Sequence, residues 1–298
     1  MTMPILLLLI LSVTSGLLIA LAFDRLAPAK GATAAVADAV EEAVEHAAAR
    51  SWRQRRTDPA VATGLALTAA VGMLIVSGLV VGILIYLVRG NATLASIDSS
   101  AADWGHDHAT ELSTRMLTWV TDLGNWPVVP LIGIPLLLIE WRRAPSRYAL
   151  PFLVAVFAGD KLITNGIKVL VDRARPTLNP IAETLGPSFP SGHSSTAASF
   201  YAALELILAR RRSARVRALL AGAAGGIAVA VASSRVLLDV HWLSDVIAGV
   251  LVGWAWFSLC AIAFGSRGLH FAEPMERAAE HEAVPPNPPS AAHPAAKV

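Results

Sequence analysis

The chain has 298 residues, of which 55% are hydrophobic and only 15% are charged, and its formal net charge at pH 7 is +2. An ordinary soluble domain carries about 25% charged residues, so this composition excludes that class and indicates an integral membrane protein. The small net charge does not suggest a nucleic acid or another polyanion as a partner. The single cysteine, Cys260, excludes an intrachain disulfide framework and a cysteine-based metal site.

The first apolar block, residues 4–23, has the length of a membrane span, roughly 20 residues. It could also be a signal peptide cleaved near its "ALA" stretch. A signal peptide carries positive charge before its apolar block, whereas here no Lys or Arg precedes the block and Arg25 and Lys30 follow it. We therefore interpret the block as a retained transmembrane helix with its N-terminus outside.

The next stretch, residues 31–50, is rich in alanine, and Val36, Val40 and Val44 recur at every fourth position among acidic residues. This spacing is typical of an amphipathic helix on the membrane surface or against a partner helix. Arginines then cluster in residues 50–56. The sequence thus predicts an N-terminal region, residues 1–57, with one transmembrane helix and one amphipathic surface helix.

Further apolar blocks predict six membrane-spanning helices, and the tail after them is polar and proline-rich. The predicted fold class is all-α: a polytopic transmembrane bundle with a six-helix core in residues 58–265 and one extra N-terminal transmembrane helix. Residues 266–298 are predicted to form a disordered cytoplasmic tail. The expected core spans are residues 60–88, 124–140, 148–171, 193–209, 217–235 and 243–265.

Arginine-rich connections orient these spans, because positively charged connections stay in the cytoplasm. Six alternating spans that start near residue 60 bring all the arginine-rich connections to one side. Those connections are residues 50–56, 141–147 and 210–217. The remaining connections, which we predict to lie together on the outer face, are residues 89–123, 172–192 and 236–242.

The third core span ends in the pattern K-x6-RP, formed by Lys168, Arg175 and Pro176. A spacing of seven residues is about two helical turns, so both cations can project from one helix face toward the same end. Pro176 disfavours helix at Arg175 and turns the chain out. Two cations at the lip of a membrane span are costly unless an anion or a carboxylate meets them.

The motif PSGH, Pro190 to His193, immediately precedes an apolar run. Pro, Ser and Gly in this position predict the start of a helix. Free backbone N–H groups and the positive end of the helix dipole at such a start favour phosphate binding. Gly192 lets the backbone approach an anion, and Ser191 can cap the helix and contact phosphate as well.

A third pattern, SR-x5-H-x3-D, is formed by Ser234, Arg235, His241 and Asp245. The guanidinium of Arg235 suits bidentate binding of phosphate oxygens. On a helix, the spacing of four would place His241 and Asp245 on one face. The carboxylate can then accept the proton on the imidazole Nδ1, which leaves Nε2 as a nucleophile or base.

Two histidines, the second being His193, and three cations around one anion indicate phosphoryl transfer without a metal. A two-metal site would need several carboxylates or histidines, and residues 172–192 offer only Asp172 and Glu183. The "HDH" stretch at residues 106–108 could bind a metal, but we interpret it as solvated.

The motif neighbours Asp172, Arg173 and Asp239 are predicted to be salt-bridged or solvated. Asp160 and Lys161 lie within a span and are either functional or paired with polar groups of the bundle.

In order and spacing, the three motifs resemble the signature of the type 2 phosphatidic acid phosphatase superfamily, the lipid phosphate phosphatases. The resemblance covers roughly residues 60–265, and every motif position matches. It implies that His241 attacks phosphorus and forms a phosphohistidine, that Asp245 orients it, and that His193 is the general acid and then the base for water. It further implies that phosphate is held by Lys168, Arg175, Arg235, Ser191 and Gly192. No cofactor or metal is implied.

The predicted function is hydrolysis of a phosphomonoester or pyrophosphate lipid by an integral protein of the plasma membrane, with its active site on the outer face. Phosphatidic acid, phosphatidylglycerol phosphate and polyprenyl pyrophosphate are the expected substrates. One alternative is a phosphatase of a small soluble phosphate ester. Another is a non-enzymatic membrane protein that binds or transports phosphorylated solutes. Vanadium haloperoxidases share the motifs but are typically soluble.

Overall fold

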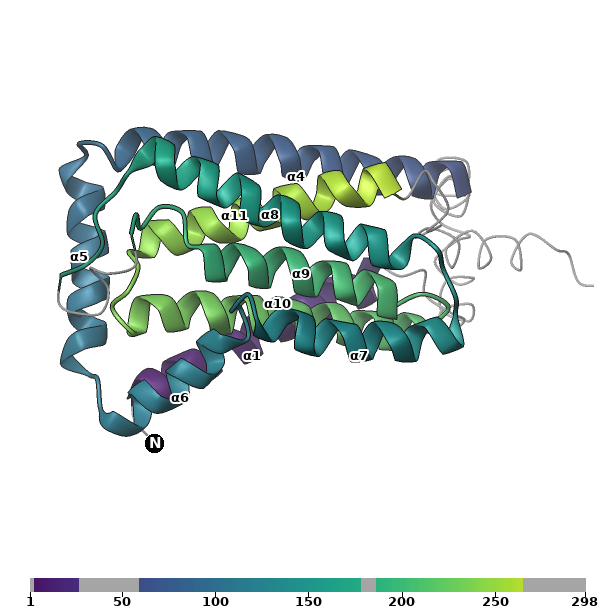
Figure 1. Ribbon diagram of the computed structural model, residues 1–298, viewed down its shortest axis with the longest axis horizontal. Coiled ribbons are helices and arrows are strands. Elements are labelled where there is room, and N and C mark those ends of the chain that lie inside the picture. The colour runs from purple at the N-terminus through teal and green to yellow at the C-terminus, as the bar shows by residue number, and fades with distance from the viewer. Residues whose placement is uncertain (1–2, 27–58, 178–185, 265–298) are drawn as a thin grey trace, which may run out of the picture. The chain divides into compact units, whose positions relative to one another are not determined.

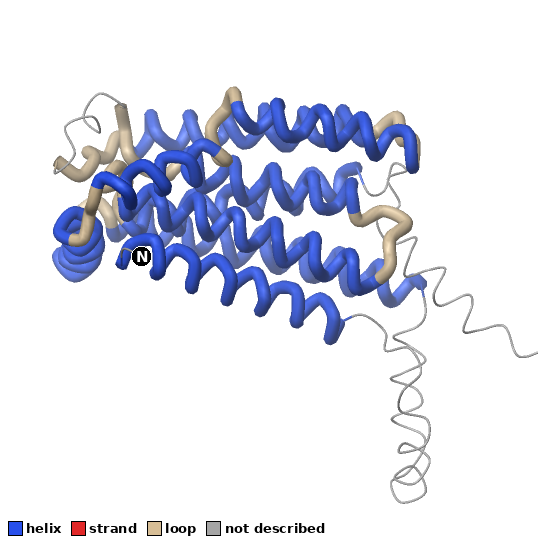
Figure 2. The backbone as a smooth tube through the Cα atoms, turned by 90° about the horizontal axis from the view of Figure 1, so that it is seen from below, coloured by secondary structure: helices blue, strands red, loops and turns tan. Residues whose placement is uncertain are grey.

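The computed structural model describes residues 3–26, 59–177 and 186–264, and within these ranges every regular element is a helix (Figures 1 and 2). The predicted all-α class is confirmed. The helices are α1 (Met3–Leu26), α4 (Pro59–Leu87), α5 (Ala92–Asp107), α6 (Glu111–Asp122), α7 (Val128–Arg143), α8 (Ala149–Val171), α9 (Gly192–Leu208), α10 (Ala214–Leu237) and α11 (Leu243–Phe264). The predictions for residues 31–50, 50–56 and 266–298 lie outside the described residues.

Helix α9 is the centre of the packing. It contacts α7, α8, α10 and α11, and these helices run side by side in both views (Figures 1 and 2). Ala197 and Ala203 let neighbouring helices approach closely, while Phe200 and Ile207 fill the space between them, and all four side chains are buried. The helix that begins at the PSGH motif is therefore held on several sides by other elements.

Four helices are long and apolar enough to cross a membrane: α4, α8, α10 and α11. Helices α7 and α9 have 16 and 17 residues, somewhat short of the ~20 residues of a perpendicular span. In α1, the apolar stretch is Met3–Ile19. Each of these helices coincides with an apolar block of the sequence.

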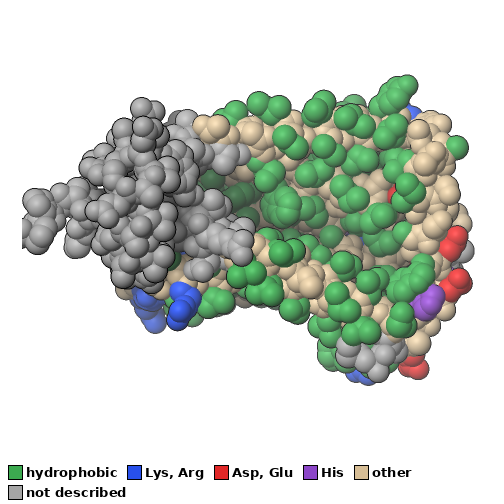
Figure 3. Space-filling model, turned by 180° about the vertical axis from the view of Figure 1, so that it is seen from behind, with side chains coloured by type: hydrophobic (Ala, Val, Ile, Leu, Met, Phe, Trp, Pro, Cys, Tyr) green, Lys and Arg blue, Asp and Glu red, His purple; other side chains and the backbone are tan. Residues whose placement is uncertain are grey.

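The surface of the bundle is suited to lipid. In Figure 3, hydrophobic side chains cover the helices, and charged side chains lie mainly toward the ends. Leu131, Leu162 and Val169 are 72%, 76% and 78% exposed, respectively. Such a surface would be a severe liability in water but matches the acyl chains of a bilayer. The predicted integral membrane class is thereby supported.

Helix α1 is part of the bundle rather than a separate anchor. It packs against α10 and also contacts α6. A Cβ atom added to Gly16 would lie 2.8 Å from the carbonyl oxygen of Gly222, and one added to Gly226 would lie 3.1 Å from that of Ser12. Small residues at these positions let the two backbones approach closely, as is common between membrane helices.

The two arginine-rich connections that the structure describes, residues 141–147 and 210–217, share one end of the bundle. Arg212, between α9 and α10, forms an ion pair at 3.2 Å with the buried carboxylate of Glu140 near the end of α7. At the other end, α5 crosses the ends of the long helices (Figure 1). The sequence predicted residues 89–123 only as a connection, but it contains α5 and α6. Their starts are fixed by the Asn91 cap and by the capping box of Thr110 and Ser113.

Candidate active site

The first motif begins at the end of α8 and continues beyond it. Lys168 lies in the last turn, and the helix ends at Val171, before Asp172, which has a left-handed φ of 45°. Arg175 lies in the segment after the helix, as the predicted span end at residue 171 and Pro176 indicated, so the expectation that Lys168 and Arg175 project from one helix face was wrong. The two cations converge all the same. Lys168 Nζ and Arg175 Nη2 donate to the carbonyl oxygen of Pro187 at 2.6 and 3.3 Å.

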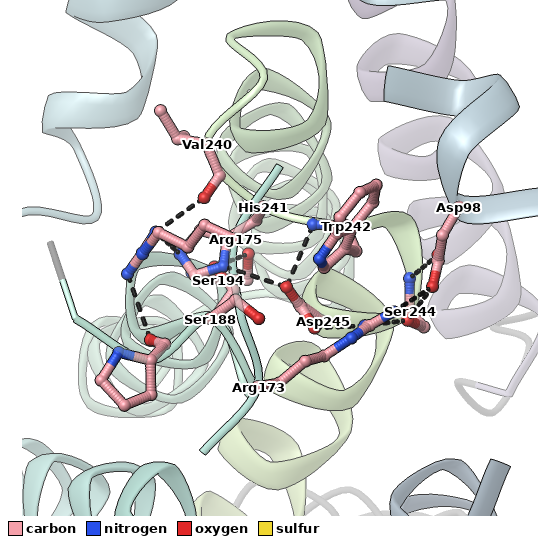
Figure 4. Close-up of polar contacts among 12 residues, drawn as sticks. Asp98, Arg173, Arg175, Ser188, Ser194, Val240, His241, Trp242, Ser244 and Asp245 are labelled. Carbon is pink, nitrogen blue, oxygen red and sulfur yellow. Dashed lines mark hydrogen bonds and ion pairs between the residues drawn. The ribbon is translucent and has the colours of Figure 1, made fainter. Parts of the chain in front are cut away.

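Arg175 connects several parts of the site. Its Nε donates to the carbonyl oxygen of Gly186 at 2.7 Å, and its Nη1 donates to that of Val240 at 2.6 Å. The same Nη1 lies 3.1 Å from Nε2 of His241 (Figure 4). Burial lowers the pKa of Arg175, while the Asp245 carboxylate raises it. Since arginine stays charged in proteins, a fixed positive charge lies beside the imidazole nitrogen.

The second motif forms the start of α9. Ser191 is the N-cap, and its Oγ accepts hydrogen bonds from the backbone N–H and the Oγ of Ser194 at 3.5 and 2.9 Å. The predicted capping role is confirmed. Gly192 is the first helical residue, and a Cβ atom added to it would meet no atom of a neighbouring described segment within 4 Å. Open space therefore adjoins the N–H groups that have no partner within the helix.

His193 follows directly in the first turn of α9. The helix start is packed tightly, because a Cβ atom added to Gly124 would lie 2.7 Å from the His193 carbonyl oxygen. Ser191, two residues before His193, donates its backbone N–H to the carbonyl oxygen of Asp245 at 2.9 Å. The second and third motifs, which carry the two histidines, therefore lie at the same end of the bundle.

Arg235, in the last turn of α10, is buried beneath the site. Its Nη1 donates to Oγ1 of Thr121 on α6 at 3.1 Å. Its carbonyl oxygen accepts from the backbone N–H groups of Val240 and His241 at 3.2 and 3.3 Å, which shapes the turn before α11. Its Nε is buried and has no hydrogen-bond partner among the described residues. A buried charged donor without a partner is uncommon and points to an anion.

His241 and Asp245 form the pair that the third motif predicted, although His241 precedes α11 and does not share a helix with Asp245. Nδ1 of His241 lies 3.4 Å from Oδ2 of Asp245, at the long end of hydrogen bonding. The backbone N–H of Trp242 donates to the same oxygen at 3.0 Å. Because the Arg175 guanidinium faces Nε2, these contacts assign the proton of a neutral imidazole to Nδ1.

The environment of His241 favours the neutral imidazole. Burial lowers its pKa well below the ordinary value of 6.5, and the positive charges of Arg175, Arg235 and Lys168 lower it further. An imidazole that is neutral at physiological pH keeps a lone pair for use as a nucleophile or base.

The prediction that Arg173 is salt-bridged or solvated is confirmed, since its Nη1 donates to Oδ1 of Asp245 and its Nη2 to Oδ2 of Asp98, both at 2.7 Å (Figure 4). The sequence did not predict which carboxylates it pairs with, and it missed Asp98. Asp98 lies on α5, and no local pattern distinguishes it.

Other polar residues have structural contacts. Asp160 is fully buried and accepts hydrogen bonds from Oγ of Ser195 and from Oγ1 of Thr196, so it pairs with polar groups of α9. The ring of His108 stacks on Trp104. Within the described part of the chain, no group of three His, Cys, Asp or Glu side chains is placed to hold a metal ion.

Comparison with known proteins relates these motifs to a family. The model of the PAP2 superfamily matches residues 148–268. Phosphatidylglycerophosphatase B of Bacillus subtilis is 35% identical over 151 residues, which cover 49% of this chain and 72% of that protein. Lipid A 1-phosphatase of Rhizobium johnstonii is 37% identical over 155 residues, which cover 47% of this chain and 59% of that protein.

A solved structure is similar as well. The crystal structure of a transmembrane PAP2 type phosphatidylglycerolphosphate phosphatase from Bacillus subtilis aligns with a TM-score of 0.58 and 27% sequence identity. The alignment covers 65% of this chain and 96% of that one. All three motifs, from Lys168 to Asp245, fall inside the matched region of the family model.

Proposed function

Because this chain belongs to the PAP2 superfamily, we propose that it hydrolyses a lipid phosphate through a phosphohistidine intermediate, without a metal ion, on the outer face of the plasma membrane. The chain is a membrane lipid phosphatase of this family. The substrate, the catalytic steps, the roles of the site residues and the orientation are proposed.

The convergence of three distant segments around His241 is the observation that carries the proposal. Arg175 Nη1 lies 3.1 Å from Nε2 of this histidine. The buried Nε of Arg235 has no partner among the described residues. The N-terminus of α9 adds backbone N–H groups at the same end of the bundle. A tetrahedral dianion satisfies these groups together.

In the first step, Nε2 of His241 attacks phosphorus, so that an N–P bond forms while the P–O bond to the lipid breaks. His193 in its protonated form gives its proton to the departing oxygen. Asp245 holds the proton on Nδ1 and stabilises the positive charge that develops on the imidazole.

Cationic and backbone donors stabilise the transferring group, whose negative charge is spread over its equatorial oxygens. A phosphoryl group would compete with the carbonyl oxygens of Gly186, Pro187 and Val240 for these donors, and in doing so would free Nε2 for attack. The proposed phosphate ligands are Lys168, Arg175, Arg235, Ser191 and the amide of Gly192.

In the second step, His193 takes a proton from water, and the water oxygen attacks phosphorus. The N–P bond breaks, inorganic phosphate is released, and the imidazole of His241 regains its lone pair. The side-chain cations supply the positive charge that a metal ion supplies in other phosphatases, so the proposed cycle includes no metal-dependent step.

A lipid substrate is favoured by the surroundings of the site. Val169 and Leu170, next to Lys168 on α8, are 78% and 75% exposed, so acyl chains can lie against the helix while the head group reaches the cations. Phosphatidic acid, phosphatidylglycerol phosphate and polyprenyl pyrophosphate are the proposed substrates. The name of the Bacillus subtilis relative makes phosphatidylglycerol phosphate the first to test.

Phosphate release by the purified protein tests the proposal. The protein in mixed micelles is offered each of the three lipids and a water-soluble ester such as p-nitrophenyl phosphate, with and without EDTA. We expect a lipid to be hydrolysed with the highest kcat/KM and EDTA to have no effect. Preference for the soluble ester would contradict the lipid assignment, and loss of turnover in EDTA would contradict the metal-free mechanism.

The nucleophile is tested by His241→Ala. We expect kcat to fall by more than about 10³-fold, because the proposed covalent intermediate forms on Nε2 of His241. His106→Ala, which removes an exposed histidine of α5, is the matched control and should keep full activity. If His241→Ala turned over at the wild-type rate, the proposed mechanism would be wrong. If the wild type bound lipid phosphate without releasing phosphate, the transporter alternative would replace it.

A further inference from the structure

Helix α5 carries none of the motif residues, yet it is tied into the site through Asp98. This carboxylate is 1% exposed. Its Oδ1 accepts from the backbone N–H of Ser244 at 2.9 Å, and its Oδ2 accepts from Oγ of Ser244 at 2.6 Å and from Nη2 of Arg173 at 2.7 Å. Burying a carboxylate is costly unless it is paired and hydrogen-bonded. The contacts of Asp98 therefore form a buried, hydrogen-bonded network rather than a surface ion pair.

Arg173 lies between two carboxylates. Its Nη1 donates to Oδ1 of Asp245 and to Oγ of Ser244, each at 2.7 Å, while its Nη2 binds Asp98. Its guanidinium also lies 5.4 Å from the ring centre of Trp242. Arg173 thus engages one oxygen of Asp245 and leaves the other for His241, as Figure 4 shows.

We propose that Asp98 and Arg173 are positioning residues for catalysis, with Asp98 acting through Arg173 to fix the orientation and charge of Asp245 behind the His241 nucleophile. The inference rests on the proposed function. Neither residue contacts the imidazole in the described structure, and both act through Asp245.

Alternation of charge gives the physical reason. Asp98 is negative, Arg173 positive and Asp245 negative, and His241 becomes positive when it attacks phosphorus. Without the Asp98 charge, Asp245 is the one carboxylate paired with Arg173 in the described structure. The guanidinium then neutralises more of the negative charge that Asp245 needs in order to stabilise the imidazolium of His241. Without Arg173, two buried carboxylates face each other and Asp245 can rotate away. Burial strengthens both effects, because charges in a low dielectric are poorly screened.

A purely structural role makes a different prediction. The contacts of Asp98 with Ser244 also join α5 to the start of α11. If the contacts of Asp98 served only to connect α5 to α11, substitutions of Asp98 would lower thermal stability and the folded fraction. The kcat of the folded enzyme would then not change. A positioning role lowers kcat per folded enzyme and leaves KM nearly unchanged, because the phosphate ligands are untouched.

The first experiment measures kcat, KM and thermal unfolding of Asp98→Asn and Arg173→Lys on a lipid phosphate. We expect kcat to fall about 10- to 100-fold in each, the range seen when a hydrogen-bond partner behind a metal ligand is removed, with KM within about twofold of wild type. Lysine keeps the charge but cannot reach two carboxylates as a planar fork does. Asp103→Asn, an exposed aspartate of the same helix, is the matched control and should retain wild-type kcat.

A charge-balanced double variant separates charge from packing. In Arg173→Gln, the two carboxylates lose the cation between them. Adding Asp98→Asn removes one of those charges, so we expect the double variant to have a several-fold higher kcat than Arg173→Gln alone. If the fold-changes in kcat caused by the two substitutions simply multiplied in the double variant, Asp98 would not act through Arg173. That result would overturn the proposal.

Wild-type kcat in folded Asp98→Asn or in folded Arg173→Lys would also overturn it, while the proposed function stands if wild type and Asp103→Asn are active. A wild-type protein that releases no phosphate from any lipid would remove the proposed function and this inference together.

Discussion

At the residue scale, the chemistry depends on one buried imidazole and its two neighbours. Asp245 lies 3.4 Å from Nδ1 of His241, and Arg175 lies 3.1 Å from Nε2. The carboxylate selects the tautomer, and the guanidinium stands where the phosphoryl oxygens are expected. The positive surroundings that attract a phosphate thus also keep the nucleophile deprotonated.

This arrangement predicts how activity depends on pH. Burial and then Arg175, Arg235 and Lys168 lower the pKa of His241 below 6.5, and an imidazole is deprotonated above its pKa. We therefore expect the acid limb of kcat/KM to lie below pH 6.5. Arg175→Gln removes the nearest cation, so it should raise the pKa of His241 and move the acid limb to higher pH, besides lowering kcat/KM.

The measurement is kcat/KM for wild type, Arg175→Gln and the control Arg115→Gln, an exposed arginine of α6, across roughly pH 4 to 9. If His241 is the titrating group, only Arg175→Gln shifts the limb. An acid limb that Arg175→Gln leaves in place would assign the titration to another residue.

At the element scale, close contact between α9 and α11 sets the relation between the second and third motifs. The backbone N–H of Ser191 donates to the carbonyl oxygen of Asp245 at 2.9 Å. One turn further along α11, a Cβ atom added to Gly249 would lie 2.5 Å from the Ser191 carbonyl oxygen, and Gly253 makes a similar approach to Ser195. Glycine at these positions lets α11 lie directly against the start of α9.

We expect Gly249→Ala to push α11 away from Ser191 and so to misalign the phosphate cradle with Asp245. The cost of such overpacking is typically about 1–3 kcal/mol, and kcat should fall with it. Gly82→Ala on α4 is the control, because a Cβ atom there would meet no neighbouring atom of the described residues within 4 Å, and it should keep activity and stability. Thermal unfolding and phosphate release check both variants. Equal behaviour of the two would refute the importance of this contact.

At the scale of the whole molecule, the bundle has two chemically different ends. The motif residues gather where α8 and α10 end and α9 and α11 begin, with α5 across them (Figure 1). Arg212 pairs with Glu140 at the other end. The positive-inside rule then favours a cytoplasmic arginine-rich end and an outer active site.

Cysteine labelling tests that orientation. In a Cys260→Ser background, Thr177→Cys introduces a thiol at the motif end, and Ser213→Cys introduces one at the arginine-rich end; both positions are exposed. We expect a membrane-impermeant maleimide to label the first variant in intact cells and the second only after permeabilisation. The reverse pattern would place the active site in the cytoplasm.

Several features of the fold could be predicted from the sequence, because they depend on local properties. Apolar blocks predicted each long helix within a few residues, and the PSGH motif predicted the start of α9. The end of α8 was also predicted, since the apolar block stops at residue 171 and Pro176 disfavours helix at Arg175. The left-handed φ of Asp172, through which Lys168 and Arg175 leave a common helix face, has no local signal in the sequence. The two helices within residues 89–123 were missed because they are short and lie outside the apolar blocks.

The sequence by itself determined that this protein is a helical membrane protein whose three motifs contain cations and imidazoles. It could do so because the length of the apolar blocks, the capping residues and the motif spacing are local properties of the chain. Only the tertiary structure decided which other side chains hold the motif residues in place. Arg173 and Asp98 are 75 residues apart, and Asp98 and Ser244 are 146 apart. Contacts over such separations depend on how helices pack, and no periodicity along the chain encodes them.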